Sequence, residues 1–355
     1  MRMRRYLAAE CLVLAVMVAG TGLVVRGLVR IALAERARPA PLAFSGAFAT
    51  PAARDLGFLP NPATAQDSAG TFLGMEDDSL IERLRHEPVL RMRLNKGGSS
   101  LSFRVDFADG SRAAFKPAQT NLQTIPRKEV AAYRLNRLLG LSAVAPATPR
   151  MLSRDDIFLH LQGDTEHLLP RIRAETIFDP HGSTAGVMMY WIPVIRDSRL
   201  DTPEGVAEST QWLTAGQPIP MHRHALAAQL SDMLVFDFII ANPDRYSGGN
   251  MMTNEDGSRL FFMDNTMSFF IEPEGNEKVR TALHRAQRFS RRLFAALDRL
   301  SETTLAQVLT QASEGEYEIL TQPEIRAVVS RRDYVRRYID GLVASYGAQE
   351  VLYFP

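Results

Sequence analysis

Residues 232–250 read DMLVFDFIIANPDRYSGGN, and this stretch decides how the rest of the chain is interpreted. A helix is predicted from about 222 to 241, because leucine or phenylalanine recurs every fourth residue from Leu226 to Phe238. Residues 241–250 are polar and rich in glycine, so the helix ends there and a loop begins. A loop that follows a rigid helix holds polar side chains open to solvent, which makes it the first candidate for a functional site.

A second acidic residue, Asp264, follows the apolar strand predicted at 260–263, twenty residues after Asp244 of the loop. Two carboxylates and an asparagine are the oxygen ligands that magnesium prefers, and phosphoryl transfer depends on such a cation. The alternative, from these residues alone, is that both segments only form turns.

The first half of the chain adds a lysine and a glutamate. Lys116 ends a β-hairpin predicted from the alternating residues 101–107, an Asp-Gly turn and a second strand. Glu129 lies in a helix predicted at 126–139 and capped by Gly140. A strand lysine paired with a helix glutamate positions nucleotide phosphates in protein kinases, although each residue taken singly is as consistent with an exposed charge. Only four of the 41 basic residues are lysines, so a lysine at 116 favours a need for a compact ammonium.

The first half of the chain is rich in predicted strands and the second half in predicted helices. A Gly97-Gly98 turn precedes the hairpin, and its backbone N–H groups are expected to lie over phosphates unless it is an ordinary turn. Further predictions are a short helix at 75–86, a buried strand at 183–194, and amphipathic helices at 290–311 and 324–346. This order predicts two lobes with a cleft between them.

Four motifs together resemble a known group of kinases: FKP, EVAAYRLNRLLGL, DMLVFDFIIANPDRYSGGN and FFMDN. Over about residues 90–345 the chain resembles the four-jointed and Golgi casein kinase group of secretory-pathway kinases, especially its bacterial relatives. More distantly, it is similar to HipA-type kinases and to phosphatidylinositol 3- and 4-kinases. The resemblance implies an α+β, atypical bilobal protein-kinase-like fold with a small β-rich N-lobe and a helical C-lobe.

The resemblance also implies roles for individual residues. Asp244 would be catalytic, ATP would be bound by Lys116, Glu129, Gly97 and Gly98, and Mg²⁺ or Mn²⁺ would be held by Asp264 and Asn250. The sequence departs from the pattern because Asn250 lies six residues after Asp244, where several relatives have five. Tyr246 stands where a histidine is common, and the animal enzymes depend on disulfides that a chain with one cysteine cannot form.

Residues 1–34 are predicted to be a single N-terminal membrane helix. The run 11–25 carries no charge, and Arg26 and Arg30 can extend their charges to the membrane surface. A cleaved signal peptide that ends near 32–34 is one alternative, and a buried helix is another. Arginines lie on both sides of the run, so the positive-inside rule assigns no orientation. Residues 35–74 are rich in Ala, Pro and Gly and are predicted to be a linker, before an N-lobe at 75–195 and a C-lobe at 196–355.

Composition excludes several classes of protein. Hydrophobic residues make up 46% of the 355 and charged residues 23%, as in globular proteins. A net charge of +1 gives no basis for a nucleic-acid partner, and the single Cys11 excludes an intramolecular disulfide. From the four motifs and the resemblance they carry, we predict an ATP- and divalent-metal-dependent kinase that acts on a protein and is anchored in the bacterial inner membrane. A small-molecule or lipid kinase and a membrane-anchored pseudokinase or scaffold are the alternatives.

Overall fold

The computed structural model describes residues 70–355 except 96–98, 163–165 and 310–317. The predicted membrane helix, most of the predicted linker and the Gly97-Gly98 turn therefore lie outside the described residues. Within the described part, no helix is long and apolar enough to cross a membrane.

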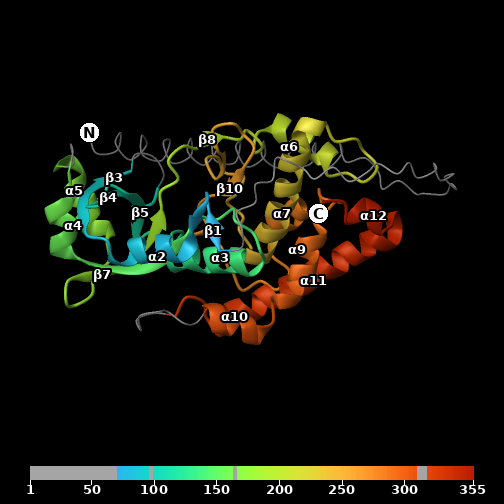
Figure 1. The fold of residues 1–355 in the computed structure, drawn as a ribbon. Helices are drawn as coiled ribbons and strands as arrows, with labels where there is room; N and C mark the ends of the chain where they lie inside the picture. Colours follow the sequence, from blue (N-terminus) through green and yellow to red (C-terminus); the bar gives the residue numbers. More distant parts are fainter. Residues whose placement is uncertain (1–69, 96–98, 163–165, 310–317) are drawn as a thin grey trace, which may run out of the picture. The chain divides into compact units, whose positions relative to one another are not determined.

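The N-lobe is built on a five-stranded antiparallel sheet with the order β3-β4-β5-β7-β6 (Figure 1). Its strands are β3 (Val89–Leu94), β4 (Phe103–Phe107), β5 (Arg112–Pro117), β6 (Ala147–Ser153) and β7 (Ser183–Tyr190). The predicted hairpin is β4 and β5. The strand predicted at 183–194 ends at Tyr190, three residues before Pro193, which has no N–H to continue a ladder. Short helices α4 (Arg154–His160), η1 (Glu166–Leu168) and α5 (Leu169–Glu175) join β6 to β7.

Residues 70–74 are part of the fold, so the linker prediction is wrong at this end. Strand β1 (Thr71–Phe72) pairs with β2 (Met75–Glu76), and helix α2 (Asp77–His86) follows directly. The Phe72 side chain is fully buried, with its ring 5.8 Å from that of Tyr190 and 6.0 Å from that of Phe261. One buried aromatic ring is enough to fix a segment whose composition is otherwise typical of a linker.

Helix α3 (Arg127–Leu138) follows β5 in sequence and contacts both strands β6 and β7 of the sheet and the core of the helical C-lobe. Its buried Val130 and Leu135 belong to the same apolar cluster as Phe236 of the C-lobe, whereas the sheet has a second cluster of its own. The helix ends at the C-cap Leu139, so the predicted cap Gly140 lies one residue beyond the observed one, with φ of +74°. The described residues of both lobes consequently lie in one compact unit.

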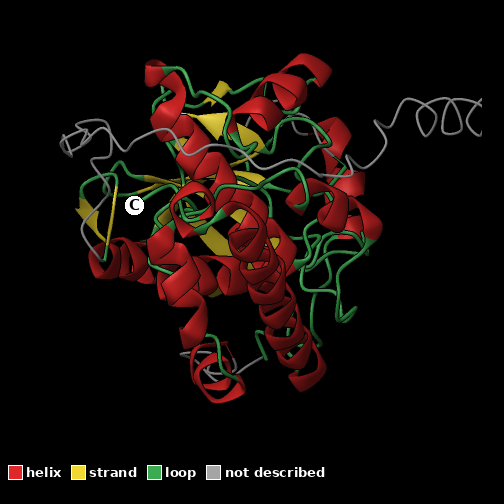
Figure 2. Ribbon diagram, turned by 90° about the vertical axis from the view of Figure 1, so that its right-hand side faces the viewer, coloured by secondary structure: helices red, strands yellow, loops and turns green. Residues whose placement is uncertain are grey.

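The C-lobe surrounds helix α7 (His224–Ile240), which is buried on nearly every side. Figure 2 shows helices on most sides of the strands. A small sheet of order β10-β9-β8 lies beside it. Its strands are β8 (Arg196–Asp197), β9 (Met251–Thr253) and β10 (Leu260–Phe262). The other helical elements are α6 (Pro203–Trp212), η2 (Met221–Arg223), α8 (Glu277–Leu283), α9 (Arg291–Ala296), η3 (Leu297–Arg299), α10 (Glu302–Leu309), α11 (Gln322–Tyr346) and α12 (Ala348–Val351).

The prediction of a single helix at 290–311 is wrong, because helical structure is interrupted between η3 and α10. The backbone leaves helical geometry at Leu300, where ψ is +65°. Ser301 then accepts a hydrogen bond from the backbone N of Thr304 at 3.1 Å and starts a new helix. The apolar spacing continues through the break, so periodicity alone did not show it.

Candidate active site

The position of Lys116 follows from the alternation of strand β5. Phe115 points into the core of the sheet, so Lys116 points to the opposite face, next to the C-lobe. Lys116 lies opposite Val187 of β7, and the neighbouring Gly186 leaves room for the Phe115 ring. A Cβ at Gly186 would lie 2.5 Å from that ring, so only glycine fits beside it.

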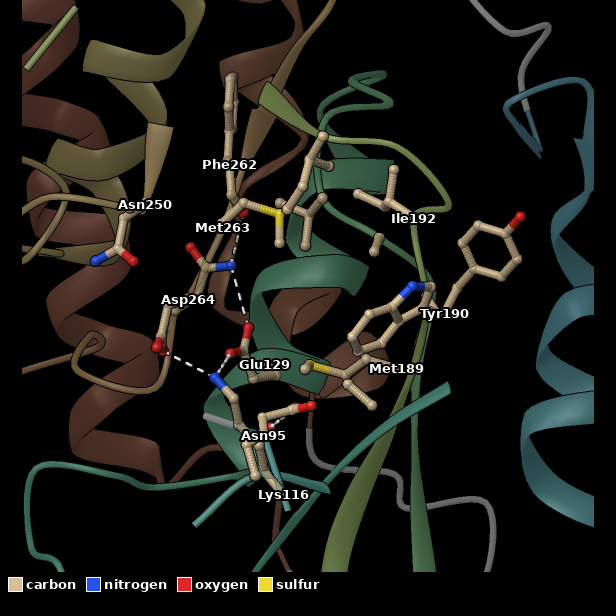
Figure 3. Close-up of a pocket in the computed structure, with 18 of the residues that line it drawn as sticks. Asn95, Lys116, Glu129, Met189, Tyr190, Ile192, Asn250, Phe262, Met263 and Asp264 are labelled. Atoms are coloured by element: carbon tan, nitrogen blue, oxygen red, sulfur yellow. Dashed lines mark hydrogen bonds and ion pairs between the residues drawn. The ribbon is translucent and has the colours of Figure 1, made fainter. Parts of the chain in front are cut away.

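Two side chains from distant parts of the chain meet at Lys116 (Figure 3). The Lys116 ammonium donates to Glu129 Oε1 of α3 at 2.8 Å and to Asp264 Oδ1 at 2.9 Å. Asn265 Nδ2 donates to the other Glu129 oxygen at 3.2 Å. The structure therefore brings together the lysine, the glutamate and the strand-end aspartate that the sequence singled out.

The charges of this group stabilise one another. Burial of the ammonium alone would lower the pKa of Lys116, but the Glu129 and Asp264 carboxylates outweigh burial and raise it. Burial alone would raise the pKa of Asp264, but the ammonium and a hydrogen bond from Thr266 lower it to about 2. The lysine is therefore cationic and Asp264 anionic at physiological pH, as a site for phosphates and a cation requires.

Asp264 is held in an uncommon backbone conformation two residues after β10. Its φ is +49°, in the left-handed region that residues other than glycine rarely adopt. Thr266 Oγ1 donates to its Oδ1 at 2.7 Å, and Asn242 Nδ2 donates to its carbonyl oxygen at 3.2 Å. Among the described residues, no hydrogen bond is donated to Oδ2, so this oxygen remains available to a ligand.

The loop after α7 folds around Asp244. Its backbone N donates to Asn242 Oδ1 at 3.0 Å, and Asn250 Nδ2 donates to its Oδ2 at 3.2 Å. Gly248 and Gly249 have φ of +95° and +77°, so both occupy the left-handed region. Asn250, which follows these glycines, lines the same cavity as Asp264.

Arg245 is the site residue that sequence reasoning missed. Its guanidinium is 1% exposed and forms a bidentate pair with Asp237 of α7, with an N–O distance of 2.8 Å. It also donates to Asn265 Oδ1 at 2.7 Å and to the carbonyl oxygens of Asn250 and Met263. Arg245 thus ties the loop to the segment that carries Asp264. The sequence did carry a signal for this pair, because Asp237 is an acid inside an apolar helix, eight residues before Arg245.

A cavity of about 490 Å³ joins these groups between the lobes. Its polar wall includes Lys116, Glu129, Asp264 and Asn250, and its apolar wall includes Val144, Met189, Ile192 and Phe262. Asp244 is not part of the wall but lies one hydrogen bond away, through Asn250. One apolar and one charged wall suit a ligand that has a flat ring at one end and phosphates at the other.

The donor set fits a cation that is shared with a phosphate ligand. No cluster of three or more His, Cys, Asp or Glu residues in the described part of the chain could hold a metal by itself. Asp264 Oδ2 and the amide oxygen of Asn250 offer two oxygen donors on the cavity wall. Magnesium in phosphoryl-transfer sites is held in this way, by one or two protein oxygens together with the substrate phosphates.

Comparison with known proteins shows a kinase-like fold, at the level of structure and not of sequence. No family model and no curated protein matches the sequence. Among solved structures, the fold is similar to that of the Golgi casein kinase, at 16% identity and a TM-score of 0.59 over 78% of each chain. The Golgi casein kinase with Mn/ADP bound matches at 17% identity and a TM-score of 0.60, also over 78% of each chain. The structure of hydra Fam20 with sugar matches at 17% identity and a TM-score of 0.60, over 77% of this chain and 90% of the other. The resemblance predicted from the motifs is confirmed at the level of the fold.

Proposed function

We propose that this chain is an ATP- and divalent-metal-dependent phosphotransferase that transfers phosphate to a hydroxyl group of a protein. The observation that carries the proposal is the convergence of Glu129 and Asp264 on Lys116, across 148 residues of sequence, at one cavity. This convergence pairs a phosphate-binding ammonium with a carboxylate that keeps an oxygen for a cation.

Each residue has a distinct part in the proposal. Lys116 binds nucleotide phosphates and Glu129 orients it, while Asp264 and Asn250 hold Mg²⁺ or Mn²⁺. The cation supplies neutralisation of phosphate charge. Asp244 orients the acceptor hydroxyl and accepts its proton. The Mn/ADP bound to the structurally similar Golgi casein kinase supports this choice of ligands.

Ligand binding by the full-length protein in detergent tests the site before any substrate is known. ADP with Mn²⁺ or Mg²⁺ should raise the melting temperature, because a ligand that binds only the native state stabilises it. The Lys116→Met variant serves as the control and should lose the shift. No shift with any nucleotide and divalent cation would contradict the proposal.

The acceptor of labelled γ-phosphate then distinguishes a protein kinase from a lipid or small-molecule kinase and from a pseudokinase. Transfer to protein supports the proposal, and transfer only to a lipid or a small molecule favours the alternative kinase. Nucleotide binding without transfer to any of these acceptors favours a pseudokinase.

The proposal includes a membrane anchor at residues 1–34 in a bacterial inner membrane. The uncharged run 11–25 between arginines supports it. Protease accessibility of the domain in intact spheroplasts identifies its side, which also decides whether cytoplasmic ATP reaches the site.

A further inference from the structure

A second charged cluster lies behind the candidate site, where α3 meets the first turn of α11. Arg127 of α3 makes a bidentate pair with Glu324 of α11, with both N–O distances at 2.9 Å. Arg127 also donates to the carbonyl oxygen of Ile319 at 2.6 Å. The two side chains are 22% and 8% exposed, so this pair is far better shielded than an ordinary surface ion pair.

The next residue of α3, Lys128, connects the cluster to the segment that follows Asp264. Its ammonium donates to the carbonyl oxygen of Ser268 and lies 4.8 Å from the centre of the Phe270 ring. It is also 3.9 Å from Glu324 Oε1. Its side chain is only 4% exposed.

Glu324 is fixed on its own helix before it contacts either partner. Thr321 and Glu324 form a capping box, in which the Thr321 backbone N donates to Glu324 Oε2 at 2.8 Å. The same helix contacts two other parts of the site, because Arg331 donates to the carbonyl oxygens of Ile239 and Phe270. Helix α11 is therefore a rigid support for both α3 and the segment after Asp264.

We propose that Arg127, Lys128 and Glu324 form a positioning junction that holds Glu129 and Asp264 in reach of Lys116. Glu129 follows Arg127 and Lys128 directly in the first turn of α3, so a shift of this turn moves its carboxylate. Ser268 lies four residues after Asp264, so its contact with Lys128 restrains that segment. None of the three junction residues lines the cavity, so they act only by positioning Glu129 and Asp264.

The kinetic part of the test rests on the proposed function, because it measures activity with ATP. All measurements use the full-length protein. Arg127→Met removes the pair with Glu324, and Arg336→Met is the matched control. Arg336 also pairs with a carboxylate, that of Asp298, and is 30% exposed, but within the described residues no hydrogen bond or ion pair joins it to α3 or to residues 265–270. We expect Arg127→Met to lower kcat/KM for ATP about tenfold, within the range for residues of one network, and Arg336→Met to change it less than about twofold.

A double-mutant cycle distinguishes positioning from a general loss of structure. If the junction acts through Glu129, Arg127→Met should cost less than about twofold in a Glu129→Gln background. The proposal would be overturned if Arg127→Met lowered kcat/KM as much in the Glu129→Gln background as in the wild type. It would also be overturned if Arg127→Met and Arg336→Met lowered kcat/KM equally. Should Arg127→Met fail to fold, Glu324→Gln replaces it, since glutamine keeps an acceptor oxygen for the cap but loses the charge.

Hydrogen exchange tests the junction without any activity. We expect Arg127→Met to lower protection in the first turn of α3 and in residues 265–270, and Arg336→Met to leave both unchanged. Unchanged protection in Arg127→Met overturns the junction even if the enzyme is active. Lost protection in an inactive protein supports the junction and contradicts only the proposed function.

Discussion

Lys116 is the residue on which the candidate site depends most directly. Its side chain is 8% exposed and is held between two carboxylates at 2.8 and 2.9 Å. The removal of one partner from such a buried group leaves an uncompensated charge.

Lys116→Arg should therefore be as damaging to turnover as Lys116→Met. A guanidinium is longer, planar and forked, so it does not fit between Glu129 and Asp264 as a point charge does. We expect both variants to lose about 100-fold or more in single-turnover phosphate transfer, as for other groups that stabilise transition-state charge. Near-normal turnover of the arginine variant would contradict this geometry.

Asp264→Ala should abolish metal-dependent nucleotide binding while the fold remains. Asp264 lines the cavity, its Oδ2 has no hydrogen-bond partner among the described residues, and its low pKa keeps it ionised at neutral pH. Titration of ADP with and without Mn²⁺ measures the effect, and circular dichroism checks the fold. Unchanged magnesium or manganese dependence in the variant would remove Asp264 as a ligand.

Asp244→Asn should slow the chemical step and leave nucleotide affinity nearly unchanged. Asparagine keeps an oxygen that can accept from Asn250, but it cannot take a proton. We expect turnover to fall by about 100-fold or more, although positioning carries much of phosphoryl transfer. Single-turnover kinetics and a nucleotide titration on the same variant separate the two effects. If Asp244 only supports the turn, asparagine should leave turnover untouched.

Helix α7 and the loop after it show how far the sequence predicts the elements. The apolar run, the polar loop and strand β10 each have a local pattern, so their order and the positions of Asp244 and Asp264 were predictable. The contacts of Arg245 were not, because its partners lie on α7, at Asn265 and on two backbone carbonyls. The junction at Glu324 was equally hidden, because Arg127 lies 197 residues away in sequence.

The same helix carries a buried acid, Asp232, that the proposed chemistry does not use. Its Oδ1 is buried without a hydrogen-bond partner in the described structure, and burial raises its pKa to about 7. Since the folded state holds this proton more tightly than the unfolded state, Asp232 should lower stability as pH rises from about 4 to about 7.

Asp232→Asn should accordingly stabilise the protein at pH 8. We expect a gain of roughly 1–4 kcal/mol, at about 1.4 kcal/mol for each unit of pKa difference. Thermal unfolding at pH 5 and pH 8 measures it, because the gain should be smaller at the lower pH. An equal effect at both pH values would show that Asp232 is ionised in the folded protein throughout this range.

At the scale of the whole described molecule, contacts outside the candidate site also hold the two lobes together. Helix α3 belongs to the N-lobe in sequence, but its apolar face is part of the C-lobe core. Arg127 and Lys128 add charged contacts between this helix and α11. The lobes should therefore unfold together, because loss of either one exposes the face of α3.

The two tryptophans of the chain allow this cooperativity to be tested. Trp191 lines the cavity just after β7, whereas Trp212 is 3% exposed in the C-lobe. Trp212→Phe leaves Trp191 as a reporter of the site, while far-UV circular dichroism reports mainly the helices of the C-lobe. In a urea titration we expect both signals to change with one midpoint, and ADP with Mn²⁺ to raise that midpoint for both. A change at Trp191 at clearly lower urea would mean that the N-lobe unfolds alone, and that the core shared through α3 does not couple the lobes.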